Sequence, residues 1–137
     1  MHEKIWDGIQ RHIQSLGGFE KAVVIEVKPG YAKFSIDLTQ EAINLYGIVH
    51  GGFLFTLCDM ASGMATYCYE VNNTTAQANI NFLRGIKLEE GTLFVEAKTI
   101  HKGRSTAINQ VEVTNESGKL FASATYTMFL LAPIICE

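Results

Sequence analysis

An aspartate and a histidine stand in the most apolar segment of this chain. The segment 47–65 reads GIVHGGFLFTLCDMASGMA and places Asp59 nine residues after His50. A carboxylate in surroundings of low polarity binds its proton more tightly, so it can act as a general base near neutral pH. His50 is followed by Gly51 and Gly52, which leave the backbone open to close approach. These residues are the first candidates for chemistry.

The region from residue 51 to about residue 69 is predicted to be a long helix that is buried on most sides. It contains no proline, and its apolar residues run nearly all the way round, whereas a surface helix would show a broad polar face. The first N–H groups of a helix have no partner within the helix and lie at the positive end of its dipole. The N–H of Gly51 is therefore a candidate donor to an oxyanion.

A curved antiparallel sheet is predicted to wrap this helix, because one flat sheet could not bury a helix that is apolar all round. Period-two alternation and turn residues such as Asn72-Asn73 predict strands at about 22–28, 31–38, 74–84, 91–101, 104–114 and 119–131. Residues 39–50 are expected to form a loop with one short helical turn, and residues 3–15 an amphipathic helix. The predicted class is α+β, with one domain over 1–137 made of an N-terminal helix within 1–18 and a core over 20–131.

Composition narrows the functional classes. The chain has 137 residues, of which 47% are hydrophobic and 18% charged, with a net charge of −3. These values are typical of a folded globular protein and disfavour nucleic-acid binding. Neither a secretory signal nor a membrane span is recognisable, and three cysteines form no framework, so a cytoplasmic protein is expected. No histidine, cysteine or acid stands at ligand spacing to His50, so no metal is expected.

Three stretches resemble a known family, the PaaI-type hotdog thioesterases. The first is NLYGIVHGGFLFTLCD, and the others are ANINFLR and KGRSTAINQVEVTNESGKLFASATYTM, so the resemblance covers roughly residues 20–130. The positions that match the signature are Asn44, Gly47, His50, Gly51, Gly52 and Asp59.

The resemblance implies a hotdog fold and hydrolysis of acyl-CoA thioesters by a homodimer or a dimer of dimers, without a cofactor. It implies that Asn44 and Gly51 of one subunit meet Asp59 and a hydroxyl of the other. The hydroxyl is assigned to Thr75, although a shift of one residue would exchange it with Thr74.

The distance between Gly51 and Asp59 also favours a dimer. Eight residues along a helix separate their backbones by about 12 Å, and the two residues face different directions. One thioester carbon therefore cannot easily meet both within one chain. An antiparallel partner helix would bring Asp59 of one subunit to Gly51 of the other and create two equivalent sites.

Several of these residues also have a purely structural interpretation. Asp59 could bond to a buried group, and Asn44 could be a turn residue instead of a substrate ligand. For His50 we favour a neutral side chain bonded to backbone over a role in proton transfer. Cys58 is interpreted as an inert core residue, because burial beside an acid raises the pKa of a thiol.

Candidate substrate contacts are more widely spread. Arg84, Lys102 and Arg104 could bind the phosphates of CoA, or could be ordinary surface charges. Gly52 and Gly103 would let a substrate come close to the backbone. Four aromatic residues could line an acyl tunnel or belong to the core, namely Phe53, Phe55, Tyr67 and Tyr69.

The function expected from the sequence is acyl-CoA thioester hydrolysis. In this hypothesis the Gly51 N–H polarises the carbonyl, and Asp59 activates water or attacks directly, with help from Thr75. Two alternatives stay open, a hotdog dimer that binds acyl-CoA or lipid without turnover, and a hydratase or dehydratase of acyl thioesters.

Overall fold

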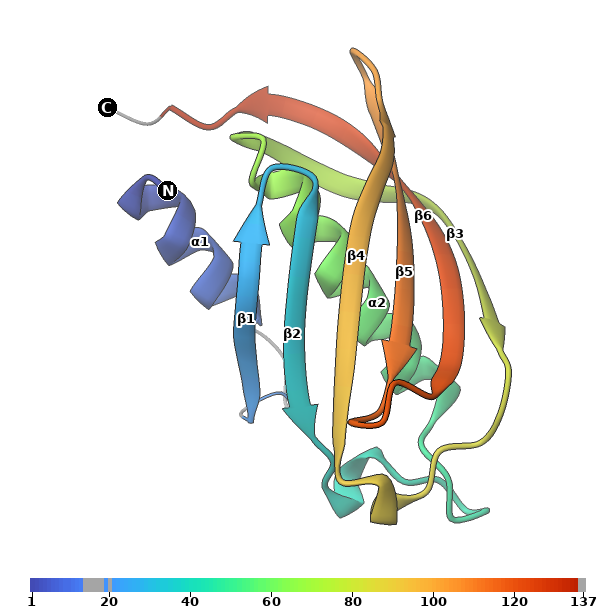
Figure 1. Cartoon of the computed structure of the whole chain (residues 1–137). Coiled ribbons are helices and arrows are strands. Elements are labelled where there is room, and N and C mark those ends of the chain that lie inside the picture. Colours follow the sequence, from blue (N-terminus) through green and yellow to red (C-terminus); the bar gives the residue numbers. More distant parts are fainter. Residues whose placement is uncertain (14–18, 20, 136–137) are drawn as a thin grey trace.

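The computed structural model describes residues 1–13, 19 and 21–135, and its core is one helix held in a curved sheet (Figure 1). The elements in chain order are α1 (Glu3–Ile13), β1 (Ala22–Lys28), β2 (Tyr31–Asp37), the short 3₁₀ helix η1 (Gln40–Ala42), α2 (Gly51–Tyr67), β3 (Val71–Phe82), the 3₁₀ helix η2 (Leu88–Glu90), β4 (Thr92–Lys102), β5 (Thr106–Thr114) and β6 (Leu120–Pro133). The sheet is antiparallel, with strand order β1-β2-β4-β5-β6-β3. The predicted α+β architecture is therefore confirmed.

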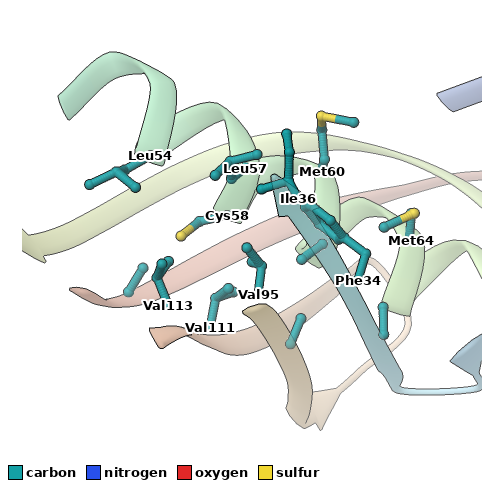
Figure 2. Close-up of a cluster of buried hydrophobic side chains, with 14 of the residues drawn as sticks. Phe34, Ile36, Leu54, Leu57, Cys58, Met60, Met64, Val95, Val111 and Val113 are labelled. Atoms are coloured by element: carbon teal, nitrogen blue, oxygen red, sulfur yellow. The ribbon is translucent and has the colours of Figure 1, made fainter. Parts of the chain in front are cut away.

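Helix α2 is buried along most of its length, as its apolar composition predicted. Ten of its residues are buried, and the side chains of Leu57, Cys58 and Met64 lie in the core against Phe34 and Val95 (Figure 2). Burial of a large aliphatic side chain stabilises the fold by roughly 1.5–3 kcal/mol. This packing fixes α2 inside the sheet.

Two local predictions were wrong. Asn72-Asn73 is not a turn but part of β3, and the chain reverses at residues 68–70, where Glu70 has a φ of +63°. The side chains of both asparagines are used inside the fold, because Asn73 donates to the Gly63 carbonyl and Asn72 to the Ala132 carbonyl. In β1, a bulge after Val24 interrupts the expected alternation, and Ile25 is left half exposed. The last two residues of the helix predicted at 3–15 lie outside the described residues.

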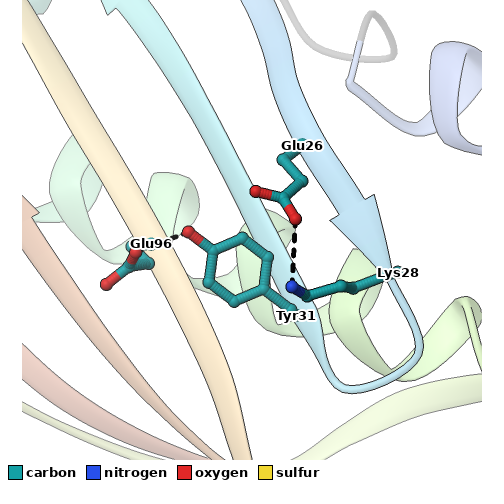
Figure 3. Close-up of polar contacts among 4 residues, drawn as sticks. All are labelled: Glu26, Lys28, Tyr31 and Glu96. Atoms are coloured by element: carbon teal, nitrogen blue, oxygen red, sulfur yellow. Dashed lines mark hydrogen bonds and ion pairs between the residues drawn. The ribbon is translucent and has the colours of Figure 1, made fainter.

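The face of the sheet that points away from α2 carries polar contacts remote from the apolar segment. Tyr31 of β2 donates a hydrogen bond of 2.5 Å to Glu96 of β4, and Lys28 forms an exposed 3.0 Å ion pair with Glu26 (Figure 3). Desolvation, together with the nearby carboxylates of Glu96 and Glu26, raises the pKa of the Tyr31 hydroxyl. Exposed ion pairs contribute little to stability.

No helix among the described residues is long and apolar enough to cross a bilayer.

Candidate active site

The start of α2 forms the first part of the site. His50 is the N-cap residue, and its backbone N–H donates to the Ala42 carbonyl at 2.8 Å, while its exposed side chain makes no capping bond. Gly51 is the first helical residue, so its N–H belongs to the group without a partner inside the helix. A Cβ at Gly51 would lie 3.3 Å from the Cζ atom of Phe82, so a larger residue would crowd this position.

Asn44 braces the loop that leads into α2. Its Oδ1 accepts hydrogen bonds from the N–H groups of Tyr46 at 2.9 Å and Ile48 at 3.2 Å. Gly47 completes this turn with a φ of +79°, a conformation that favours glycine. The structure therefore shows Asn44 in the turn position that was one of its two interpretations. Two backbone N–H groups occupy the Oδ1 atom of Asn44. Its side-chain NH₂ group has no hydrogen-bond partner within the described part of the chain and can donate to another molecule.

Asn44 and Gly51 lie on the same hollow, which has a volume of about 300 Å³. Phe82 and Arg84 at the end of β3 also line it. The structure therefore brings Arg84 together with the two predicted carbonyl-binding residues.

Asp59 lies on a half-buried face of α2, where Thr75 of β3 donates a hydrogen bond to its Oδ1. The contact selects Thr75 over Thr74, whose side chain is exposed on the other face of the strand. No lysine, arginine or histidine of the described residues forms an ion pair with Asp59. The carboxylate is therefore oriented by a neutral hydroxyl.

A β-bulge aims Thr75 at Asp59. In the ladder with β6, Ala78 and Ile80 pair with Tyr126 and Ala124 on the inner face, but the register shifts between Thr75 and Gln77. Without this extra residue the alternation would turn Thr75 to the outer face of the sheet. Bulges often re-aim a side chain in this way beside functional sites.

Two buried neighbours define the surroundings of Asp59. The Tyr126 hydroxyl donates to the Phe55 carbonyl at 2.6 Å, one turn before Asp59. Desolvation, with smaller effects of Cys58 and Asp59, raises the pKa of Tyr126, so it stays a neutral donor. Burial and the charge of Asp59 raise the pKa of the Cys58 thiol to about 12. Cys58 is therefore unreactive near neutral pH, as predicted.

A buried polar network between β5 and the C-terminal half of α2 was missed in the sequence. The Asn109 side chain of β5 is fully buried and donates to the hydroxyls of Ser62 at 2.7 Å and Thr66 at 2.9 Å. Its oxygen accepts a 2.6 Å hydrogen bond from Thr99. This network fixes the rotation of α2 about its axis, and thereby the direction in which Asp59 points. The sequence contained a signal for this buried asparagine, because Asn109 falls on the inner face of β5 between Ala107 and Val111.

The predicted phosphate-binding residues do not lie close together within a single subunit. Lys102, Gly103 and Arg104 lie at the β4–β5 hairpin, and the ammonium group of Lys102 sits over the Tyr69 ring at 5.2 Å. Tyr69 follows the C-terminal end of α2, whereas Arg84 lines the hollow that contains Gly51 at its N-terminal end. Gly52 is exposed, and a Cβ there would meet no atom within 4 Å.

The four aromatic residues are also dispersed. Phe53 stacks on Phe19, with ring centroids 5.2 Å apart, and Tyr67 packs against Gly8 of α1. Phe55 is partly exposed beside Tyr126. Within the described residues no group of three or more His, Cys, Asp or Glu side chains could hold a metal ion.

Comparison with known proteins decides the family. The model of the thioesterase superfamily matches residues 46–122, more than half of the chain and the whole span from Gly51 to Thr75. The chain belongs to the thioesterase superfamily. The resemblance inferred from the HGG segment is thus confirmed.

Members of this superfamily share both sequence and fold with the chain. Human acyl-coenzyme A thioesterase 13 is 30% identical over 113 residues, 80% of each protein. A hypothetical thioesterase from Streptococcus pneumoniae, solved with coenzyme A, is 30% identical with a TM-score of 0.86, and 94% of this chain aligns with 98% of that one. The Escherichia coli PaaI protein is 23% identical with a TM-score of 0.86, and the alignment covers 98% of each chain, which establishes the hotdog fold.

Two variants of the S. pneumoniae thioesterase have also been solved. One replaces an aspartate with alanine, and the other replaces a threonine 16 positions later. Asp59 and Thr75 of this chain are separated by the same 16 positions.

Proposed function

We propose that this chain is an acyl-CoA thioesterase whose reactive centre is shared between two subunits. The observation that carries the proposal is the contact between Thr75 and Asp59, which presents an oriented carboxylate with no cationic partner among the described residues. Relatives named acyl-coenzyme A thioesterases and the S. pneumoniae thioesterase solved with coenzyme A support the substrate class.

The second subunit would supply the carbonyl-binding residues. Within one chain Gly51 and Asp59 are eight residues apart on α2, about 12 Å along the axis, which is too far for one carbonyl group. In a two-fold dimer with antiparallel α2 helices, the partner's Gly51 N–H and Asn44 NH₂ would face Asp59. Two equivalent sites would result.

The free surface beside the site supports such a dimer. Strand β3 is an edge strand of twelve residues, and long unpaired edges are usually covered in native proteins. Near it, large apolar side chains are exposed in the single chain, namely Leu45, Tyr46, Phe55, Phe82 and Leu83. Exposed apolar clusters of this kind are typical of subunit contacts.

The chemistry then follows from the positions of the donors and the base. Water held by Asp59 attacks the thioester carbon, forms the new C–O bond and gives its proton to the carboxylate. The carbonyl oxygen becomes an oxyanion, which the N–H of Gly51 and the NH₂ of Asn44 stabilise. The C–S bond then breaks, the proton returns to the leaving sulfur, and the products are free acid and CoA. In the alternative course Asp59 attacks the carbon directly, and water hydrolyses the resulting anhydride.

A panel of acyl-CoA thioesters tests this function, with release of free thiol as the measurement. A hydrolase shows turnover that Asp59→Ala abolishes. Tight binding of acyl-CoA without turnover would indicate a sensor, and a changed acyl chain on an intact thioester would indicate a hydratase or dehydratase. Either result would overturn the proposal.

A further inference from the structure

A second hollow lies between α1 and α2. It has a volume of about 360 Å³ and is lined by Gly8 and Arg11 of α1, Gly63 and Tyr67 of α2, and Asn72 and Asn73 of β3, among others. It is distinct from the hollow at Gly51, with which it shares no lining residue.

The position of Gly63 connects this hollow to the carboxylate. Gly63 follows Asp59 by four residues, so the two lie on the same face of α2 about 6 Å apart along the axis. Strand β3 runs alongside the same face of α2. Thr75 bonds to Asp59, and Asn73 donates to the Gly63 carbonyl at 3.3 Å. A group attached to a carbonyl at Asp59 can therefore extend along α2 into the hollow.

A close contact between α1 and α2 bounds the hollow on one side. The ring of Tyr67 lies against Gly8, where a Cβ would come within 2.6 Å of three ring or hydroxyl atoms. Tyr67 lies about 12 Å beyond Asp59 along the helix. With carbon–carbon bonds of about 1.5 Å, an acyl group of about five or six carbons spans the interval to the middle of the hollow.

The lining of the hollow combines apolar side chains, Ile9 and Met64, with polar ones, and Arg11 is its one charged residue among the described part of the chain. The Arg11 side chain makes only a long 3.4 Å hydrogen bond, to the Asp7 carbonyl, and belongs to neither ion pair found among the described residues. The amide nitrogens of Asn72 and Asn73 already donate within the fold, which leaves the Arg11 guanidinium as the charged donor among the described lining residues. A long saturated chain would desolvate these groups without compensation. A guanidinium, in contrast, matches the geometry of a carboxylate.

We propose that this hollow binds the far end of the acyl group and that Arg11 selects short acyl groups that end in a carboxylate. The inference rests on the proposed thioesterase function and names the substrate class of the same site. Arg11 would act as a specificity-determining residue, because it lines the hollow for the far end of the acyl group and does not contact the reacting carbon.

Acyl-CoA pairs of equal length test the inference directly. The pairs are glutaryl-CoA with pentanoyl-CoA and adipoyl-CoA with hexanoyl-CoA, and the measured quantity is kcat/KM for thiol release. We expect the native protein to prefer the dicarboxylic member of each pair by about tenfold or more, the size of a charge-assisted hydrogen bond. Arg11→Gln should remove this preference, because it lowers kcat/KM far more for the dicarboxylic member of each pair than for the monocarboxylic member, and Arg11→Lys should keep part of the preference.

Lys21→Gln is the matched control, since it removes one exposed positive charge elsewhere on the surface. Equal rates for both members of each pair, or an Arg11→Gln effect equal on both, would overturn the inference while the thioesterase function stands. Absence of any hydrolysis in the panel would overturn the thioesterase function as well.

Discussion

Thr75 donates a hydrogen bond to Asp59, and a β-bulge in the edge strand makes this contact possible. The pair joins the middle of the buried helix to the strand beside it. The bond leaves the second carboxylate oxygen without a described donor. This arrangement orients a base toward the open side of α2, where a second subunit is proposed to lie.

The first prediction separates Thr75 from its neighbour. Asp59→Asn should lower kcat by about 10²- to 10⁴-fold, because the general base is lost. Thr75→Ala should lower kcat by about tenfold, the equivalent of one hydrogen bond to the carboxylate. Thr74→Ala removes the same atoms from the face of β3 that points away from Asp59 and should leave steady-state kinetics unchanged. Equal losses for the two threonine variants would contradict the assignment.

The second prediction separates two roles of Asn44. Asn44→Asp keeps an oxygen for the N–H groups of Tyr46 and Ile48 but removes the NH₂ group. We expect the free energy of unfolding to change by less than about 1 kcal/mol, while kcat falls by about 10²-fold because an oxyanion donor is lost. Asn44→Ala should lower both stability and kcat. If Asn44→Asp retained full activity, Asn44 would be a turn residue alone.

The third prediction concerns Asn109. Asn109→Ala leaves the hydroxyls of Ser62, Thr66 and Thr99 without their buried partner, so the free energy of unfolding should fall by about 3 kcal/mol. Urea unfolding followed by circular dichroism measures this. Asn79→Ala, on the exposed face of β3, is the control and should stay within about 0.5 kcal/mol. Matching values for the two variants would contradict a stabilising network.

The fourth prediction uses the pKa of Cys58, which rises from 9.0 to about 12 on folding. The folded protein holds the proton that the unfolded chain loses, so the contribution to stability is complete below about pH 9 and is lost as pH rises toward 12. Thermal unfolding of Cys58→Ala between pH 8 and 10.5 should therefore depend less on pH than that of the native protein. If the melting temperatures of the two proteins changed with pH to the same extent, the raised pKa of Cys58 would be contradicted. Rapid alkylation of Cys58 at pH 7 would contradict it as well.

The sequence was sufficient for the elements but not for their local irregularities. Apolar periodicity predicted the buried helix, and turn residues predicted most strand ends within two or three positions. It could not resolve Thr74 from Thr75, because a bulge changes the face of a strand without a distinctive residue. It also placed a turn at Asn72-Asn73, since asparagine favours turns, whereas tertiary hydrogen bonds hold both residues in β3.

The site itself was predictable only in part for a related reason. Asn44, Gly51 and Asp59 were found from a signature, but the distribution of cations depends on the sheet. Two cationic sites look equivalent in sequence, the hairpin with Lys102 and Arg104 and the strand end with Arg84. They lie near opposite ends of α2. Asn109 carries no motif and is recognised only once its strand is known to face the helix.

The central claim is that each reactive centre combines Asp59 of one subunit with Gly51 of the other. Two inactive variants test it, Asp59→Ala and Gly51→Val, the second of which places a branched side chain over the donor. Both are co-expressed with different affinity tags, and the mixed dimer is isolated by two successive purifications and checked by light scattering. The account predicts that the mixed dimer regains about half of the native kcat, because one of its two sites is intact. A mixed dimer as inactive as its parents, or a monomer with native activity, would contradict it.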